Sequence, residues 1–159
     1  MDCKTPQERV RFPLSEDQAA RDGRISNPDL PCVLLVEDDP LNLIVLQAAL
    51  EDAGFQVMLA SHADEAVIKL KRSAAAITAL ITDIRLPGRI TGWGVARAAR
   101  EVKANMPVIH ISGWNEQDRR TEAVSGAIVL EKPVALSALI HAIELLLRFR
   151  SAVIWTGQS

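Results

Sequence analysis

The sequence lacks the features that mark secreted, membrane-spanning and nucleic-acid-binding proteins. Only two of its 159 residues are cysteines, and Cys3 and Cys32 have no metal-ligand spacing, so a reducing, cytoplasmic setting is the default expectation. No apolar run approaches the ~18 residues that a membrane-spanning helix needs, and the N-terminal residues have no apolar core of the kind found in signal peptides. The net charge of −2 implies no general affinity for nucleic acid or anionic membranes.

The chain is rich in aliphatic residues, and this favours one packed domain with tails. Hydrophobic residues make up 48% of the sequence, which is enough to bury a single core. Residues 1–30 mix charged residues with proline and glycine and predict a mobile N-terminal tail. We expect the domain to cover residues 31–148 and a short C-terminal tail to cover 149–159. No internal repeat and no second domain are evident.

Short apolar runs alternate with helical patterns along the domain. The runs predict five strands, at residues 32–36, 55–60, 77–82, 107–111 and 127–130. Helical patterns begin near residues 40, 63, 92, 116 and 136, and the fourth of them, at about 116–123, is strongly polar. This alternation predicts an α/β fold, in which a doubly wound parallel sheet of order 2-1-3-4-5 is covered by helices on both faces.

Local signals support two of the predicted helix starts. Asp39 is suited to cap the helix that begins with Pro40. Ser61 and Asp64 have the spacing of a capping box at the next helix, where Glu65 and Lys69 can pair one turn apart.

Polar side chains follow the ends of four predicted strands. They are Glu37, Asp38 and Asp39 after the first strand, Asp83 after the third, Ser112 after the fourth and Lys132 after the fifth. The carboxyl ends of parallel strands open onto one edge of the sheet, and strands one and three flank the point where the strand order reverses. We therefore expect Asp38 and Asp83 to lie close together.

These residue types suit one reaction. Several carboxylates in one crevice repel each other unless a cation is present, and oxygen ligands with room for water favour Mg²⁺. A carboxylate can attack phosphorus and form an aspartyl phosphate. In this interpretation Asp83 is the nucleophile, Mg²⁺ and Lys132 hold the charge, and Ser112 donates to the product.

In these motifs the chain resembles the receiver domain of two-component response regulators, from about Pro31 to Arg148. The matching motifs, in order, are Val-Glu-Asp-Asp at 36–39, Thr-Asp-Ile-Arg-Leu-Pro-Gly at 82–88, Ile-Ser-Gly at 111–113 and Glu-Lys-Pro at 131–133. The resemblance implies a flavodoxin-like fold. It also implies that the domain takes a phosphoryl group from a histidine kinase or a histidine phosphotransfer protein and then switches the binding of an effector, with a homodimer as one possible outcome.

The resemblance also implies a role for each matching residue. Asp83 is the phosphoacceptor, Ser112 the switch hydroxyl and Lys132 the lysine of the site. The implied Mg²⁺ ligands are Glu37, Asp38, Asp83 and the backbone carbonyl of Arg85, and Pro133 is expected to follow a cis peptide bond. The expected protein is a stand-alone receiver, which is not an enzyme beyond its own phosphorylation and dephosphorylation.

The sequence departs from the family at two places and leaves other functions open. The family often has tyrosine or phenylalanine where this chain has Val129, and the loop from Asp83 to Gly92 looks one residue longer than in the shortest members. A phosphorylation-independent interaction module with the same fold is the alternative function. A phosphatase with an aspartate nucleophile needs a second acid two residues later, where this chain has Arg85. We expect His110 to be a satisfied core histidine, and Trp114 either to shield the site or merely to pack.

Overall fold

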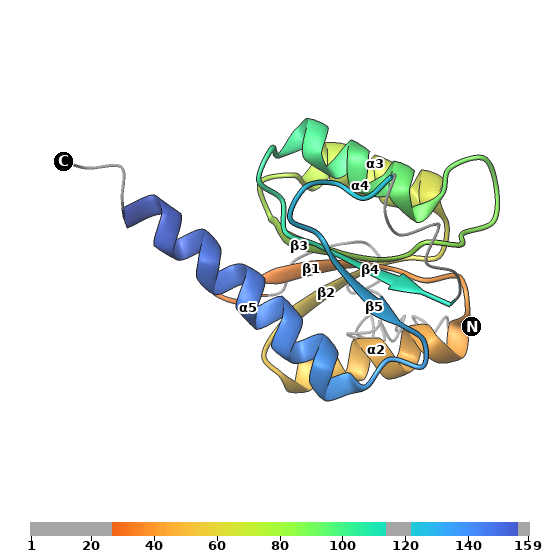
Figure 1. The fold of residues 1–159 in the computed structure, drawn as a ribbon, viewed down its shortest axis with the longest axis horizontal. Helices are drawn as coiled ribbons and strands as arrows, with labels where there is room; N and C mark the ends of the chain where they lie inside the picture. The colour runs from red at the N-terminus through yellow and green to blue at the C-terminus, as the bar shows by residue number, and fades with distance from the viewer. Residues whose placement is uncertain (1–26, 114–121, 156–159) are drawn as a thin grey trace, which may run out of the picture.

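The computed structural model describes residues 27–113 and 122–155 and contains one parallel five-stranded sheet (Figure 1). The strands are β1 (Cys32–Val36), β2 (Gln56–Ala60), β3 (Ile77–Asp83), β4 (Val108–Ser112) and β5 (Ile128–Glu131). The helices of the described ranges are α2 (Pro40–Asp52), α3 (Ala63–Ser73), α4 (Gly92–Val102) and α5 (Leu136–Trp155). The strand order is β2-β1-β3-β4-β5, which confirms the predicted doubly wound, flavodoxin-like topology.

Helices cover both faces of the sheet, so the central strands are apolar on both sides. Side chains of β1 alternate between the faces: Leu34 packs in the cluster that includes α3 and α4, whereas Val33 and Leu35 pack in the cluster that includes α2 and α5. All five residues of β1 are buried. The continuous apolar runs of the sequence therefore reflect burial on two faces rather than a helical period.

The helix starts agree with the sequence at α2 and differ at α3. The Asp39 side chain caps α2, with Oδ1 accepting from the backbone N–H of Leu41 at 2.9 Å. At α3 the N-cap residue is His62, whose side chain makes no capping bond, and the acid that reaches back is Glu65, which accepts from the Ser61 N–H at 3.0 Å. The predicted capping box with Asp64 is therefore wrong by one residue.

The last helix extends beyond the position where we expected the domain to end. α5 continues past Arg148 to Trp155, and its far end stands away from the sheet in Figure 1. The apolar stripe that predicts this helix covers only its first three turns, so the sequence pattern understates its length. The predicted polar fourth helix lies mostly outside the described residues, and its last two residues, Glu122 and Ala123, are not helical.

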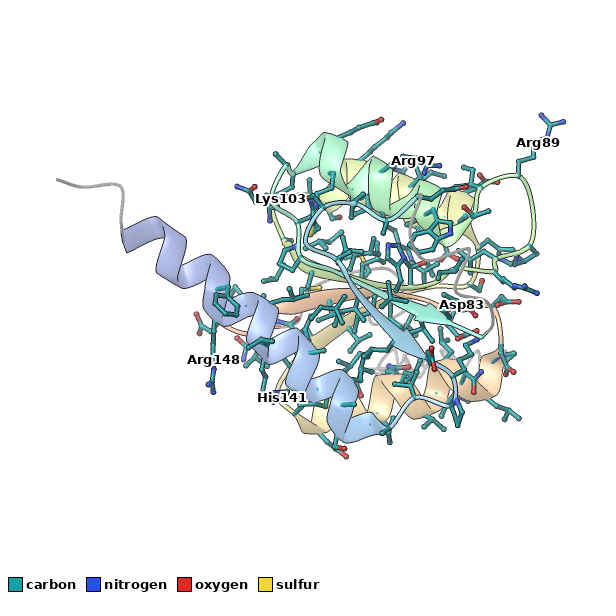
Figure 2. All side chains as sticks on the ribbon, viewed as in Figure 1. Asp83, Arg89, Arg97, Lys103, His141 and Arg148 are labelled. Carbon is teal, nitrogen blue, oxygen red and sulfur yellow. The ribbon has the colours of Figure 1, made fainter. Side chains whose placement is uncertain are left out.

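Charged side chains lie mainly on the outer surfaces of the helices. Figure 2 shows Arg97 on α4, Lys103 just after the end of α4, His141 and Arg148 along α5, and Asp83 at the edge of the sheet. Within the described ranges, no helix is both long and apolar enough to cross a membrane.

Candidate functional site

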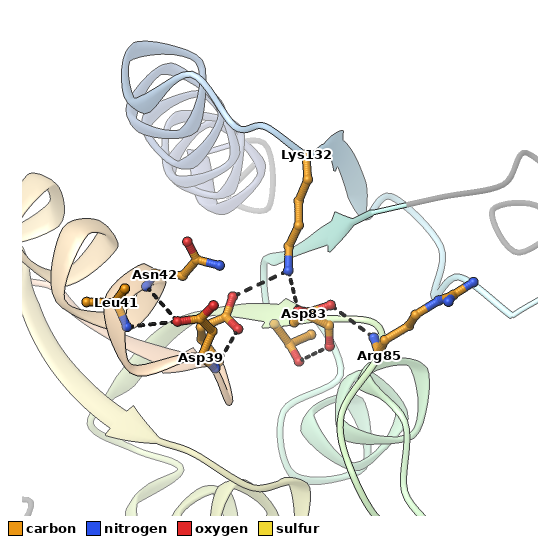
Figure 3. A network of polar contacts seen from close by, with 8 residues as sticks. Asp39, Leu41, Asn42, Asp83, Arg85 and Lys132 are labelled. Atoms are coloured by element: carbon orange, nitrogen blue, oxygen red, sulfur yellow. Dashed lines mark hydrogen bonds and ion pairs between the residues drawn. The ribbon is translucent and has the colours of Figure 1, made fainter.

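The acceptor candidate lies where the two central strands end. β1 and β3 are neighbours, with Val36 level with Thr82, so Glu37 and Asp83 both follow directly at the carboxyl edge. Asp83 is the last residue of β3 and is only 4% exposed. Its Oδ1 accepts a hydrogen bond from the backbone N–H of Arg85 at 3.0 Å, which fixes the orientation of the carboxylate (Figure 3).

Three carboxylates converge at this edge, as the sequence predicts. Glu37, Asp38 and Asp83 each offer an oxygen atom, and these atoms all lie within 4.8 Å of one another. Glu37 is buried, whereas Asp38 is exposed. Burial raises the pKa of the Glu37 carboxyl, a hydrogen bond from the Asp39 N–H and the charge of Lys132 oppose this rise, and the neighbouring carboxylates add to it.

The carboxylate cluster fits a divalent cation. Glu37 Oε2 is buried, and among the described residues it has no hydrogen-bond partner. The ion pair of this oxygen with Lys132, at 3.7 Å, is too long for a hydrogen bond, and a cation at the cluster would reduce the cost of its burial. The donor set consists of oxygen only and opens to solvent at Asp38, which suits Mg²⁺ with retained water. The carbonyl of Arg85 as a further ligand stays a prediction.

Lys132 reaches the cluster from the carboxyl end of β5, the strand at the edge of the sheet. Its Nζ lies 2.5 Å from Asp83 Oδ2 and 3.7 Å from Glu37 Oε2 (Figure 3). Burial alone would lower the pKa of this lysine, but the hydrogen bond to Asp83 and the charges of the carboxylates outweigh burial and raise it. The ammonium group therefore stays charged beside Asp83. The peptide bond between Lys132 and Pro133 is cis, as the sequence resemblance implies.

Ser112 reaches the same edge as the last residue of β4. It is buried, and its carbonyl accepts from the Lys132 N–H at 2.8 Å, so the two strand ends are tied together. The structure thus brings Glu37, Asp38, Asp83, Ser112 and Lys132 to one edge. The role of the Ser112 hydroxyl stays a prediction, and Trp114 lies outside the described residues.

Gly92 is part of the site, although it was not predicted to have a role there. A Cβ atom at Gly92 would lie 2.0 Å from the backbone oxygen of Asp83. The Gly92 N–H also donates to the Ile84 carbonyl at 2.8 Å. Only glycine allows α4 to begin this close to β3. One feature of the sequence could have pointed to this role: Gly92 stands at the predicted start of a helix, where glycine has no conformational advantage over other residues.

A groove with a volume of about 550 Å³ lies beside the cluster. Glu37 and Lys132 line its polar end, and Val45, Leu46 and Leu136 line its apolar part. The adjoining outer surface of α2 carries three exposed large apolar side chains, those of Leu41, Ile44 and Val45. An apolar surface next to a charged site is typical of a place where another protein docks.

His110 is buried, as the sequence predicts, but it is not satisfied. Neither of its ring nitrogens has a hydrogen-bond partner within the described part of the chain. Burial lowers the pKa of the imidazole from 6.5 to about 4, so the ring is neutral near pH 7. The expectation of a satisfied core histidine is therefore wrong. The ring packs against Trp93 of α4 instead.

Comparisons with known proteins agree with this geometry. Residues 33–144 match the family described as the response regulator receiver domain. A response regulator receiver protein from Sinorhizobium medicae has a similar structure, with a TM-score of 0.74, 38% sequence identity, and coverage of 77% of this chain and 98% of that chain.

Curated sequences give the same relationship. An uncharacterized 14.6 kDa protein of Leptolyngbya boryana is 31% identical over 116 residues, which are 70% of this chain and 86% of that protein. The transcriptional regulatory protein AruR of Pseudomonas aeruginosa is 35% identical over 91 residues, 55% of this chain but only 36% of AruR. The match to AruR therefore concerns one part of a longer protein. The chain belongs to the family of response regulator receiver domains.

Proposed function

We propose that this receiver domain accepts a phosphoryl group on Asp83 from a phosphohistidine protein, either a histidine kinase or a histidine phosphotransfer protein. The observation that carries the proposal is the position of the Asp83 carboxylate. It is almost wholly buried, held at one oxygen by the Arg85 N–H and bound at the other by Lys132. A carboxylate so oriented is a plausible nucleophile for phosphoryl transfer.

The transfer forms one bond and breaks one bond. An oxygen of Asp83 bonds to phosphorus while the phosphorus–nitrogen bond of the donor histidine breaks, and the donor imidazole leaves with the bonding electron pair. Lys132 lies where it can stabilise the negative charge on the phosphoryl oxygens. Glu37, Asp38 and Asp83 would hold Mg²⁺, which when bound neutralises charge on the transferring group.

The apolar surface of α2 and the adjoining groove support a protein donor. Leu41, Ile44 and Val45 are exposed on the outer side of the helix whose cap, Asp39, follows directly on the acidic pair. A partner that covers this surface would carry its own reactive group to the mouth of the Asp83 site. We propose the cytoplasm as the setting, a binding switch rather than enzymatic turnover as the outcome, and an effector protein or a second copy of the chain as the reader.

Intact mass measured after incubation with acetyl phosphate and Mg²⁺ tests the acceptor. The wild type should gain one phosphate, and Asp83→Asn should gain none. Asp39→Asn is the matched control, because it alters a neighbouring acid outside the cluster and asparagine caps a helix as well as aspartate does. Equal labelling of wild type and Asp83→Asn would mean that another residue is the acceptor.

A phosphorylation-independent interaction module is the second candidate, and Val129 is the observation that favours it. A small half-buried side chain stands on β5 where receiver domains often carry an aromatic ring. If the wild type binds Mg²⁺ but gains no phosphate from acetyl phosphate or from phosphohistidine donors, this second function is the correct one.

A further inference from the structure

His110 is a buried polar group that the proposed reaction does not use. It lies in the middle of β4, has no exposed surface, and both of its ring nitrogens are without partners among the described residues. An unpaired imidazole in an apolar setting is costly, and an aliphatic side chain would avoid this cost. A histidine at this position is therefore best explained by another state of the protein, in which a ring nitrogen of His110 makes a hydrogen bond.

Two routes connect His110 to the acceptor. The first passes through α4: the rings of His110 and Trp93 lie 4.2 Å apart with an interplanar angle of 54°. Trp93 follows Gly92, whose position against the Asp83 carbonyl leaves no room for a side chain. Any shift of the Asp83 backbone therefore presses on the first turn of α4, and so on the ring that covers His110.

The second route passes through the sheet. Thr82 on β3 and Val129 on β5 are level with His110, and in a parallel sheet level residues point to the same face. The Thr82 hydroxyl donates to the Asp83 carbonyl at 2.9 Å, and its oxygen keeps lone pairs with which it can accept another hydrogen bond. A turn of the His110 ring toward β3 would bring an imidazole N–H to this oxygen.

Ser112 supplies the trigger for such a turn. It is the next residue after His110 on the same face of β4. The phosphoryl group proposed for Asp83 adds oxygen atoms that attract the Ser112 hydroxyl. Displacement of Ser112 toward Asp83 makes room beside His110, and the small side chain of Val129 does not fill it.

We propose that His110 is a positioning residue of the acceptor site, which gains a hydrogen bond to the Thr82 hydroxyl when Asp83 carries a phosphoryl group. Trp93 holds the ring in its apolar position in the unphosphorylated protein. The new hydrogen bond stabilises the phosphorylated arrangement of β3 and β4. This inference rests on the proposed function of Asp83. In it, β4 and α4 give the structural response to phosphorylation that an aromatic ring on β5 could give in other receiver domains.

The test compares two quantities that should move in opposite directions. His110→Phe keeps a ring against Trp93 and removes both nitrogens, so it should raise the midpoint of thermal unfolding of the free protein. The same variant should weaken the binding of beryllofluoride in the presence of Mg²⁺ by about fivefold, which corresponds to one net hydrogen bond. A residue that only packs would not separate stability from affinity in this way.

A double-mutant cycle identifies the partner. Thr82→Val removes the hydroxyl and keeps the shape of the side chain, and His110→Phe combined with Thr82→Val should bind beryllofluoride no more weakly than the weaker single variant. Unchanged affinity in His110→Phe, or fully additive losses in the double variant, would overturn the inference. Because phenylalanine is larger than histidine, His110→Leu is the second variant in case His110→Phe does not fold.

Nitrogen NMR of the imidazoles gives a readout in the wild-type protein. The His110 ring nitrogens should shift on addition of beryllofluoride with Mg²⁺ but not with Mg²⁺ alone, and His62→Gln and His141→Gln assign the signals. No shift with beryllofluoride overturns the inference. Labelling of Asp83 by acetyl phosphate in wild type and His110→Phe separates the two levels: no labelling of either contradicts the proposed function, whereas labelling with unchanged beryllofluoride affinity contradicts only the role of His110.

Discussion

The two sides of the sheet have different outer surfaces. On the α3 and α4 side, long basic side chains end on backbone carbonyls: Lys69 on Leu59, Lys103 on Ile77, and Arg100 on Met106 and Ser125. On the α2 and α5 side, large apolar side chains stand in solvent, including those of Ile44 and Phe149. On the first side these basic side chains are satisfied by contacts within the chain, whereas the second side carries more apolar side chains that no described residue covers.

Asp83 lies at the boundary between these two sides, so the groove beside α2 and the first turn of α4 both adjoin it. Toward α2, Glu37 lines the groove, which is open to another molecule. Toward α4 the Asp83 backbone touches Gly92, and behind it lie Trp93 and His110. Under the proposed function, a phosphoryl donor would therefore approach from one side of the sheet, and the structural response would occur on the other side.

The largest expected effect on stability comes from adding a side-chain atom where α4 begins against β3. Gly92→Ala places a Cβ atom 2.0 Å from the Asp83 carbonyl oxygen, which is backbone and cannot turn aside. We expect the free energy of unfolding to fall by about 3 kcal/mol, the upper part of the range for overpacked sites. Alanine normally stabilises a helix relative to glycine, so a fall in the free energy of unfolding would be opposite to the change expected from helix propensity alone. Urea unfolding gives the measurement.

Gly94→Ala is the control for this substitution. Its Cβ would meet the Cγ2 methyl group of Ile90 at 2.8 Å, and a side-chain methyl group can shift by rotation about χ1, whereas a backbone carbonyl cannot. We expect a much smaller loss of stability and normal labelling of Asp83. Equal losses of unfolding free energy in the two alanine variants would show that the close contact with the Asp83 carbonyl is not what requires glycine at position 92.

A smaller effect is expected from protonating the buried ring. Burial lowers the pKa of His110 to about 4 in the folded state, compared with 6.5 for an unburied histidine. The unfolded chain therefore binds more protons between these values, so this residue makes the protein less stable as the pH falls below 6.5, and the effect levels off below about 4. Between about pH 7 and about pH 5 the loss should be about 2 kcal/mol.

The difference between wild type and His110→Phe isolates this contribution. Glu37 and the other carboxyls titrate in both proteins, so their effects cancel in the difference of the two free energies of unfolding measured across the pH range. The difference should grow as the pH falls from 6.5 to about 4. A difference that is independent of pH would mean that the ring is accessible to protons in the folded state.

The smallest effect on stability is expected on the exposed apolar surface of α2. Ile44→Glu alters a side chain that is 61% exposed, so the free energy of unfolding should change by less than about 0.5 kcal/mol. Under the proposed function, transfer from a phosphohistidine protein should slow about tenfold, since a charge would replace apolar contact area. Labelling by acetyl phosphate should not change.

Ile68→Glu is the matched control on the opposite side of the sheet, where the isoleucine of α3 is 50% exposed. It should leave both kinds of labelling unchanged. If the two glutamate variants slow protein-to-protein transfer equally, the apolar surface of α2 is not the docking site.

The sequence predicts the fold and the charged part of the site because both follow from strand ends. Asp83 and Lys132 each stand two residues after the last apolar residue of a short run, and in a parallel sheet the runs must end at one edge. Strand order and the carboxylate cluster therefore need no knowledge of side-chain geometry. The Asp39 cap of α2 is equally local, since it depends on residues within one turn.

The remaining features depend on contacts between distant segments. The acid that reaches back to Ser61 is Glu65 rather than Asp64, because the geometry of the turn decides which carboxylate points to the N–H. The unpaired state of His110 depends on what α4 and the neighbouring strands offer it. Gly92 has its role only because α4 begins against β3. None of these contacts has a signature in sequence spacing.

The length of α5 sets the direction in which anything joined to its end would point. The helix leaves the body of the domain and continues to Trp155 (Figure 1). Each residue of an α-helix advances about 1.5 Å and turns by about 100°, so anything joined to the end of α5 has its direction set by helical phase. One added residue would point a fused reporter sideways, whereas seven would nearly restore its direction at a greater distance. The response of such a fusion should therefore vary periodically with linker length.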